Sequence, residues 1–228
     1  MTKSNIPKKD MQDIQQKVTL DLRNYLRKRA FPNIARCLNN PSVQHQVYAV
    51  QTFIDLFEQY PKEEDKLLSE FLKSYLPMQK FSALLIISGI SVDHPEFGFL
   101  KMAEALNARS DISEFAANAL QNSWKNKEEQ MIANMQKYWD FNSNVNLKIV
   151  AVMTINTQTD DEEDKLLSFI GKFIDDSDVK VKSQIISKLK EFYIREPIVV
   201  EAKLREWITN SKNQNPEHKV IQMFREVL

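Results

Sequence analysis

The chain has 228 residues, of which 43% are hydrophobic and 27% charged, and its 31 basic side chains balance 31 acidic ones. This length is enough for one domain or two small ones. Because the formal net charge is zero, any electrostatic partner has to be read from local patches. The chain contains three glycines, too few for phosphate-binding loops, nucleotide folds and most β-rich folds. We therefore expect an all-α protein.

Several site classes are excluded by the same residue counts. Cys37 is the single cysteine, which rules out an internal disulfide framework and a cysteine-rich zinc site and fits a reducing cytoplasm. His45, His94 and His218 lie far apart and lack metal-ligand spacing. No stretch approaches the roughly 18 apolar residues of a membrane span, and residues 1–10 lack the apolar core of a secretory signal. We expect a cytoplasmic protein with no metal, no cofactor and no membrane segment.

Apolar residues recur at helical spacing along the chain. From Met11 to Arg29 they step by three and four, which predicts the clearest helix. The next helix is predicted to begin at Ser42, after Pro41, and to end at Pro61. Further helices are predicted at about 63–76, 78–90, 95–107, 111–125, 127–140, 144–156, 161–175, 178–194, 197–210 and 216–227. The short connections between them are typical of antiparallel helical pairs.

One heptad, EEDKLLS, occurs twice, at 63–69 and at 162–168. Upstream of it, AVQT at 49–52 matches AVMT at 151–154. The blocks 43–76 and 144–175 therefore share a helix, a polar loop and a second helix. Such a hairpin cannot cover its own apolar face and stacks on its neighbours. We predict an α-solenoid (superhelix) of HEAT-like antiparallel helical pairs, formed by a single domain over residues 1–228, in which the two blocks superpose.

Basic residues gather near the end of the first predicted helix. Arg23 and Arg27 lie one turn apart on one face, with Arg29 close by, so these side chains are candidates for contact with successive phosphates of duplex DNA. The alternative is that cations simply stabilise a helix carboxyl terminus. A second basic group is spread over more than one helix face and is expected to be solvated surface: Lys180, Lys182, Lys188 and Lys190.

Asp111 and Glu114 stand out among the acidic residues because they open the helix predicted at 111–125. In that place their carboxylates are candidates for a catalytic role on a concave surface. The alternative is structural: Asp111 caps the helix and Glu114, three residues later, completes a capping box.

Trp139 is followed directly by a polar turn, Asp140 to Asn144. An indole at this point could stack on a nucleic-acid base, or it could close the end of a helical pair by packing. Both interpretations remain open from the sequence.

The segment from about 110 to 200 resembles the AlkD-type bacterial alkylpurine DNA glycosylases, a family of HEAT-like repeats. Lys182, Ile185 and the run LKEF at 189–192, followed by PIVV at 197–200, are similar to the family's Leu-Arg-Glu-Tyr and Pro-x-Val-Val. Trp139 and Asn144 match its Trp-x-x-x-x-Asn pattern. The resemblance implies a concave, basic solenoid face that grips duplex DNA by its backbone and excises a cationic alkylated base.

The resemblance also implies roles for individual positions. The family's essential carboxylate falls on Glu114, its preceding tryptophan on Ser110, its phosphate-binding arginine on Ile149 and a second aromatic wall on Ser187. Only the acid is retained. Without aromatic walls to hold a lesion or a cation to hold its phosphate, positioning of the base is lost.

Together these observations predict a HEAT-like repeat protein that contacts duplex DNA with weak or no base excision. The residues expected to contact DNA are Arg23, Arg27, Arg29, Trp139 and Lys148, and Glu114 is the candidate catalytic acid. One alternative is an active alkylpurine DNA N-glycosylase. Another is a scaffold that binds a protein partner on its concave face and has no role on DNA, which the zero net charge favours. The position of the basic residues distinguishes these functions. Basic residues grouped with Glu114 on the concave face would indicate DNA binding, and scattered ones would indicate a scaffold.

Overall fold

The computed structural model describes residues 8–157 and 163–210. Every regular element within these residues is an α-helix, which confirms the all-α prediction. The helix predicted at 216–227 and the start of the one predicted at 161–175 lie outside them. The helices are α1 (Lys8–Arg27), α2 (Phe31–Leu38), α3 (Val43–Leu56), α4 (Pro61–Lys73), α5 (Pro77–Asp93), α6 (Pro95–Ala108), α7 (Ser113–Ser123), α8 (Glu128–Tyr138), α9 (Val145–Thr154), α10 (Glu163–Gly171), α11 (Val179–Arg195) and α12 (Pro197–Asn210).

Proline marks the start of many helices, as the sequence suggested. Four helices begin with it, at Pro61, Pro77, Pro95 and Pro197, where the missing backbone donor does no harm.

Helix α2 is absent from the prediction. It follows Arg29, whose φ of 52° places the residue in the left-handed region and turns the chain out of α1. Its apolar residues Phe31, Ile34, Ala35 and Leu38 follow helical spacing, but the helix has only eight residues, which is about two turns and a short stretch in which to detect a period.

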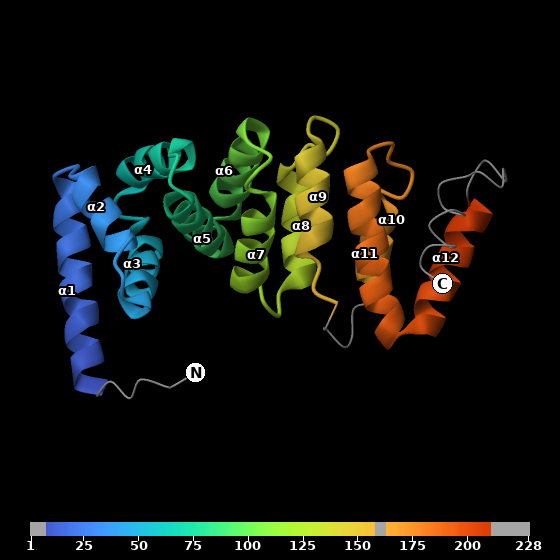
Figure 1. Cartoon of the computed structure of the whole chain (residues 1–228), viewed down its shortest axis with the longest axis horizontal. Coiled ribbons are helices and arrows are strands. Elements are labelled where there is room, and N and C mark those ends of the chain that lie inside the picture. The colour runs from blue at the N-terminus through green and yellow to red at the C-terminus, as the bar shows by residue number, and fades with distance from the viewer. Residues whose placement is uncertain (1–7, 158–162, 211–228) are drawn as a thin grey trace. The chain divides into compact units, whose positions relative to one another are not determined.

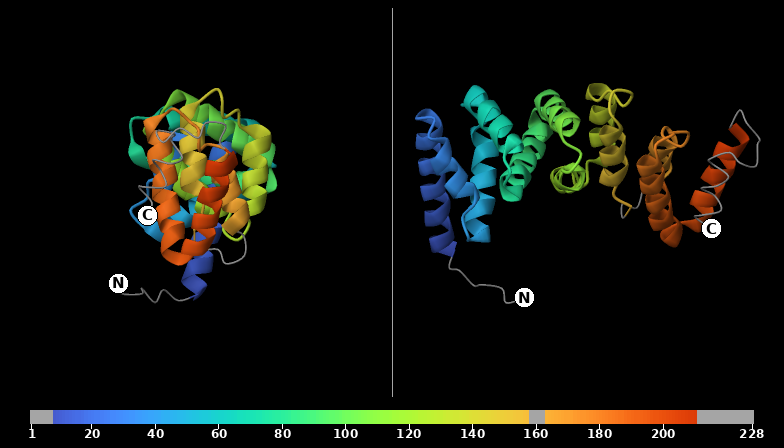
Figure 2. Two further views of the ribbon diagram at one scale, coloured as in Figure 1. Left: turned by 90° about the vertical axis from the view of Figure 1, so that its right-hand side faces the viewer. Right: turned by 45° about the horizontal axis from the view of Figure 1, so that its top comes forward.

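The helices group into two compact units, residues 1–102 (unit 1) and residues 103–228 (unit 2), with the boundary inside α6. In unit 1, α1 packs on α3 and α3 on α5, while α2 contacts all three and α4 packs on α5. In unit 2, α7, α9 and α11 lie side by side, and α8, α10 and α12 form a second row (Figures 1 and 2). The single repeat domain expected from the sequence remains a prediction.

The helices after the duplicated heptad also correspond between the two units. Helices α5 and α11 each have 17 residues, and α6 and α12 each have 14. At matched positions of the repeat, Ala49 and Ala151 are both fully buried, as are Leu67 and Leu166. Superposition of the two blocks remains a prediction that these matches support.

An ion pair recurs at the same place of the repeat. The heptad aspartate of unit 1, Asp65, pairs with Lys101 of α6 at 2.8 Å, and its counterpart Asp164 pairs with Lys203 of α12 at 3.0 Å. Both lysine side chains are about nine-tenths buried. Burial alone lowers the pKa of Lys203, but its hydrogen bonds to Asp164 and Glu206 outweigh that effect and leave the pKa raised. In both pairs the lysine side chain is buried between helices, whereas the aspartate, 48% exposed at Asp65 and 77% at Asp164, reaches the solvent.

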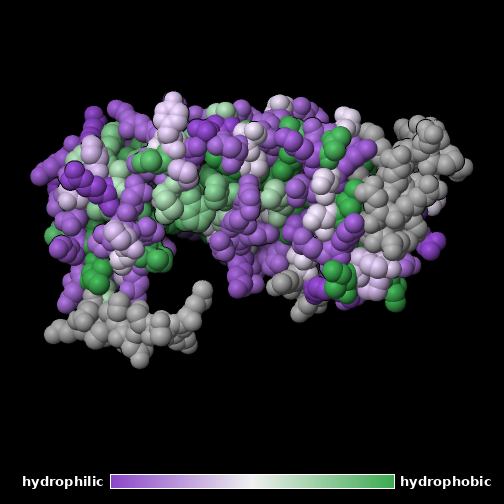
Figure 3. Space-filling view, viewed as in Figure 1, coloured by the Kyte–Doolittle hydropathy of each residue, from purple (hydrophilic) through white to green (hydrophobic). Residues whose placement is uncertain are grey.

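Two glycines of unit 1 mark close helix contacts around α5, an apolar helix over which green atoms gather in Figure 3. A Cβ at Gly98 would lie 2.5 Å from the Cα of Ser91, which is backbone. A Cβ at Gly89 would lie 2.1 Å from Cδ1 of Ile54, the end of a flexible side chain.

These contacts predict different costs for the same substitution. We expect Gly98→Ala to destabilise the protein by about 2 kcal/mol, because the backbone of α5 cannot move aside cheaply. Gly89→Ala should cost less, since Ile54 can rotate and alanine favours the helix. Chemical denaturation of the two variants beside the unchanged protein measures both values. Equal losses of stability in the two variants would show that α6 does not pack against α5 at Gly98 more tightly than α5 packs against α3 at Gly89.

Candidate functional site

A groove with a volume of about 540 Å³ lies between α7, α9 and α11 in unit 2. Ser110 and Glu114, at the start of α7, line it together with Ile149 of α9. These three positions are the ones that the family resemblance assigned to one site. They are far apart in sequence, and the packing of α7 on α9 brings them together.

The groove continues along α11 as an adjoining hollow of about 580 Å³, which shares Val179 and Ser183 with it. The hollow is lined by one face of the helix, which we name the α11 stripe: Val179, Lys182, Ser183, Ile186, Ser187 and Lys190. These residues recur every three or four positions, so they share one side of α11. Ser187, the fourth position assigned by the resemblance, belongs to this stripe.

Polar side chains pin α9 to its neighbours at both ends. At its start Asn144 caps the helix by accepting from Asn146 N–H at 2.8 Å, and its Nδ2 donates to Leu106 O at 3.2 Å. At its end Gln121 Nε2 of α7 donates to Met153 O at 3.0 Å. The wall of the groove formed by α7 and α9 is therefore fixed.

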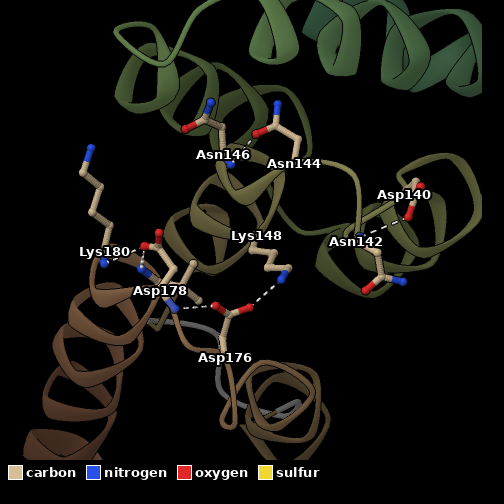
Figure 4. Close-up of polar contacts among 9 residues, drawn as sticks. Asp140, Asn142, Asn144, Asn146, Lys148, Asp176, Asp178 and Lys180 are labelled. Carbon is tan, nitrogen blue, oxygen red and sulfur yellow. Dashed lines mark hydrogen bonds and ion pairs between the residues drawn. The ribbon is translucent and has the colours of Figure 1, made fainter.

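Lys148 and Asp176 join α9 to the start of α11 (Figure 4). The Lys148 ammonium binds Asp176 Oδ2, and Asp176 Oδ1 accepts from Asp178 N–H at 2.8 Å. Asp178 in turn caps α11 by accepting from Lys180 N–H at 2.7 Å. Lys148 lines a different hollow, on the side of Lys172, and not the groove of Glu114.

The structural alternative for Asp111 and Glu114, a capping box, is wrong. Helix α7 begins at Ser113, and its N-cap is Ile112, without a side-chain hydrogen bond. Asp111 instead accepts two hydrogen bonds from Arg109, at 2.8 and 2.9 Å, because a guanidinium pairs more strongly with a carboxylate than a backbone N–H does. Glu114 is exposed and forms no hydrogen bond or ion pair with the residues the structure describes.

Trp139 is the C-cap residue of α8 and is only 4% exposed. Its ring lies 6.1 Å from that of Phe141, which in turn contacts Phe169 and Phe173 edge to face. The structure thus gives Trp139 a packing role, which was one of the two interpretations left open by the sequence.

The basic residues of α1 belong to unit 1. Arg23 and Arg27 are exposed, whereas Arg29 lies just after α1 and pairs with Glu63 at 3.2 Å. The structure therefore leaves Arg23 and Arg27 as the better candidates for contact with an anion in this unit.

The basic residues at the groove are ones that the sequence analysis assigned to solvated surface. Lys180 lines the groove, and Lys182 and Lys190 belong to the α11 stripe, which lines the adjoining hollow. In Figure 4 the side chain of Lys180 points away from Asp178. No ion pair involves these three lysines within the described parts of the chain, whereas Lys188 pairs with Glu191 at 2.9 Å. Lys182 and Lys190 lie on the same face of α11, and this spacing in the sequence could have identified them as a pair.

None of the described helices is long and apolar enough to cross a membrane. Among the same residues, no three His, Cys, Asp or Glu side chains are grouped so that they could hold a metal ion.

Comparison with known proteins found no matching family model, no matching curated protein and no matching solved structure.

The Asp176 carboxylate provides a test of how the groove is held. Asp176→Asn keeps an oxygen for Asp178 N–H but removes the charge that Lys148 needs, and four-fifths of the Lys148 side chain is buried. We expect a loss of about 2 kcal/mol in the free energy of unfolding, measured by chemical denaturation.

Asp140→Asn is the matched control. Asp140 Oδ1 accepts from Asn142 N–H at 3.0 Å, an equivalent turn contact, but it is exposed and has no lysine partner among the described residues. Equal losses in the two variants would show that the ion pair with Lys148 contributes nothing.

Proposed function

We propose that the chain is a divergent HEAT-like repeat protein of the AlkD type, an α-solenoid that binds duplex DNA by its backbone at the groove of unit 2 and excises alkylated bases slowly or not at all. The observation that supports this proposal is the convergence of Ser110, Glu114 and Ile149 in one groove, with Ser187 beside it.

The lysines at the groove supply the attraction for a polyanion. Lys182 and Lys190 are eight residues apart on one helix face, about 12 Å along the axis. Each strand of duplex DNA carries one phosphate per roughly 3.4 Å of axis, so the two ammonium groups would meet separate phosphates. Since they have no acidic partner among the described residues, phosphate binding would not have to break an existing ion pair.

The groove also contains groups that limit this binding. The Glu114 carboxylate is exposed and unpaired within the described residues, and it repels phosphate. The charge of Asp111 is offset by Arg109. We therefore expect weak, sequence-independent binding.

The groove is poorly equipped for base excision. A carboxylate stabilises a developing sugar cation best in a dry, rigid cleft with a low dielectric constant. Glu114 lies in open surroundings beside the small hydroxyl of Ser110, and Ile149, at 7% exposure, offers no charge to a phosphate. The acid is in place, but the groups that would hold the substrate against it are not.

The binding proposal is tested by a titration of duplex DNA at several salt concentrations. We expect affinity to fall steeply with salt, because each phosphate contact releases counterions. The double variant Lys182→Glu/Lys190→Glu should lower affinity at low salt by roughly tenfold or more and flatten the salt slope by about two. The variant Arg23→Glu/Arg27→Glu tests the contribution of unit 1 in the same way.

The matched control is Lys137→Glu/Lys172→Glu, which changes the net charge equally but alters lysines that do not line the groove. Binding that is absent at low salt, or reduced equally by the control, would favour the protein scaffold over DNA binding.

The excision proposal is tested by release of 7-methylguanine from methylated duplex DNA under single-turnover conditions. We expect slow or undetectable release, with any residual rate lost in Glu114→Gln. The same substitution should strengthen DNA binding, since it removes a negative charge from the groove.

Robust release by the unchanged protein, abolished in Glu114→Gln, would show instead that the protein is an active N-glycosylase. The variant Ile149→Arg/Ser187→Trp should raise the rate only if Glu114 faces the bound base.

A further inference from the structure

Glu64, in the first turn of α4, is a buried carboxyl group without a partner. Its side chain has no exposed surface, and neither Oε1 nor Oε2 has a hydrogen-bond partner among the described residues. An ionised carboxylate in such surroundings is strongly disfavoured, because nothing replaces its hydration. A group of this kind keeps its proton instead.

The duplicated heptad provides an internal comparison. Glu163 holds the same position of the heptad in unit 2, and its Oε1 lies 3.8 Å from Nη2 of Arg195 at the end of α11. Helix α5, which has the same length as α11, ends in Asp93 instead of an arginine. Unit 1 therefore lacks the cation that serves the heptad glutamate of unit 2.

The two acidic neighbours of Glu64 on its own helix are each paired with a cation. Glu63 binds Arg29, from the turn after α1, at 3.2 Å. Asp65 binds Lys101 of α6 at 2.8 Å. Neither cation hydrogen-bonds to Glu64.

Helix α5, which packs on α4, adds no cation for Glu64 either. Its charged residues are Lys80 and Asp93, and Lys80 is engaged elsewhere, since Glu64 has no hydrogen-bond partner. Burial, with no contribution from a neighbouring charge, raises the pKa of Glu64 from its usual 4.5 to about 9.

We propose that Glu64 makes unit 1 a proton-dependent fold: the unit closes with a proton on this carboxyl group and releases that proton when it opens. In the opening step the carboxyl O–H bond breaks, the proton passes to water and the carboxylate becomes hydrated. Because the pKa is higher in the closed state, the stabilising effect is complete below about pH 4.5 and is lost as pH rises toward about 9. Unit 2, whose glutamate is paired, lacks this dependence.

The test is hydrogen exchange of the full chain, read by mass spectrometry at several pH values between about 6 and 8.5 and corrected for the intrinsic exchange rate. For peptides of α4 and α5 we expect the open population to rise about tenfold per pH unit, the value for release of one proton. Peptides of α10 and α11 should show a much smaller change. An open population of α4 and α5 that does not vary with pH would overturn the proposal.

The decisive variant is Glu64→Gln, which has the same size but cannot ionise. Its α4 and α5 peptides should lose the pH dependence, and an unchanged slope would also overturn the proposal. If Glu64→Gln fails to fold, Glu64→Met, similar in length and apolar, takes its place in the same comparison. The matched control is Glu163→Gln, which should weaken protection in unit 2 and leave the pH dependence of α4 and α5 as it is.

Discussion

In each unit an ion pair between a buried lysine and the more exposed heptad aspartate joins the helix of the heptad to the second helix after it. The described helices have 8 to 20 residues and are marginal in water by themselves, so each depends on burying an apolar face against its neighbours. Apolar packing alone would tolerate small shifts of one helix along another. A charge that is nine-tenths buried does not, because only one register brings Lys101 to Asp65 or Lys203 to Asp164. In unit 2 the pair therefore favours one register of α10 against α12, in the row of helices beside the one that forms the groove.

The predictable part of the fold was encoded in local signals. Proline at the first turn and apolar residues at helical spacing located most of the helices. Helix α2 escaped because its start depends on the left-handed φ of Arg29, a conformation that the sequence does not announce at an arginine. The capping interpretation of Asp111 failed for a similar reason: the competing partner, Arg109, binds the carboxylate through its charge, which helix-cap spacing does not reveal. Local patterns thus predict where helices lie better than they predict which groups cap the helix ends.

At the site, the resemblance predicted which positions meet, and the structure brings Ser110, Glu114 and Ile149 into one groove. Sequence could not show which lysines are paired. Lys148 and Lys180 look alike in the chain, yet one is bound to Asp176 while the other lines the groove. Pairing depends on residues brought close only by packing. The same limit hid Glu64, whose heptad is identical to that of Glu163 although the two carboxyl groups have different surroundings.

The groove of unit 2 is held at several points: Gln121 of α7 bonds to α9, Asn144 caps α9 and bonds to Leu106, and Asp176 joins α9 to the start of α11. A partner would therefore meet walls that are already ordered and would not have to offset the entropy of arranging them. Walls joined in this way would resist closing over what the groove binds. Water would remain at the contact, so charges there would act through a high dielectric constant. Such a surface favours rapid exchange of partners over long residence.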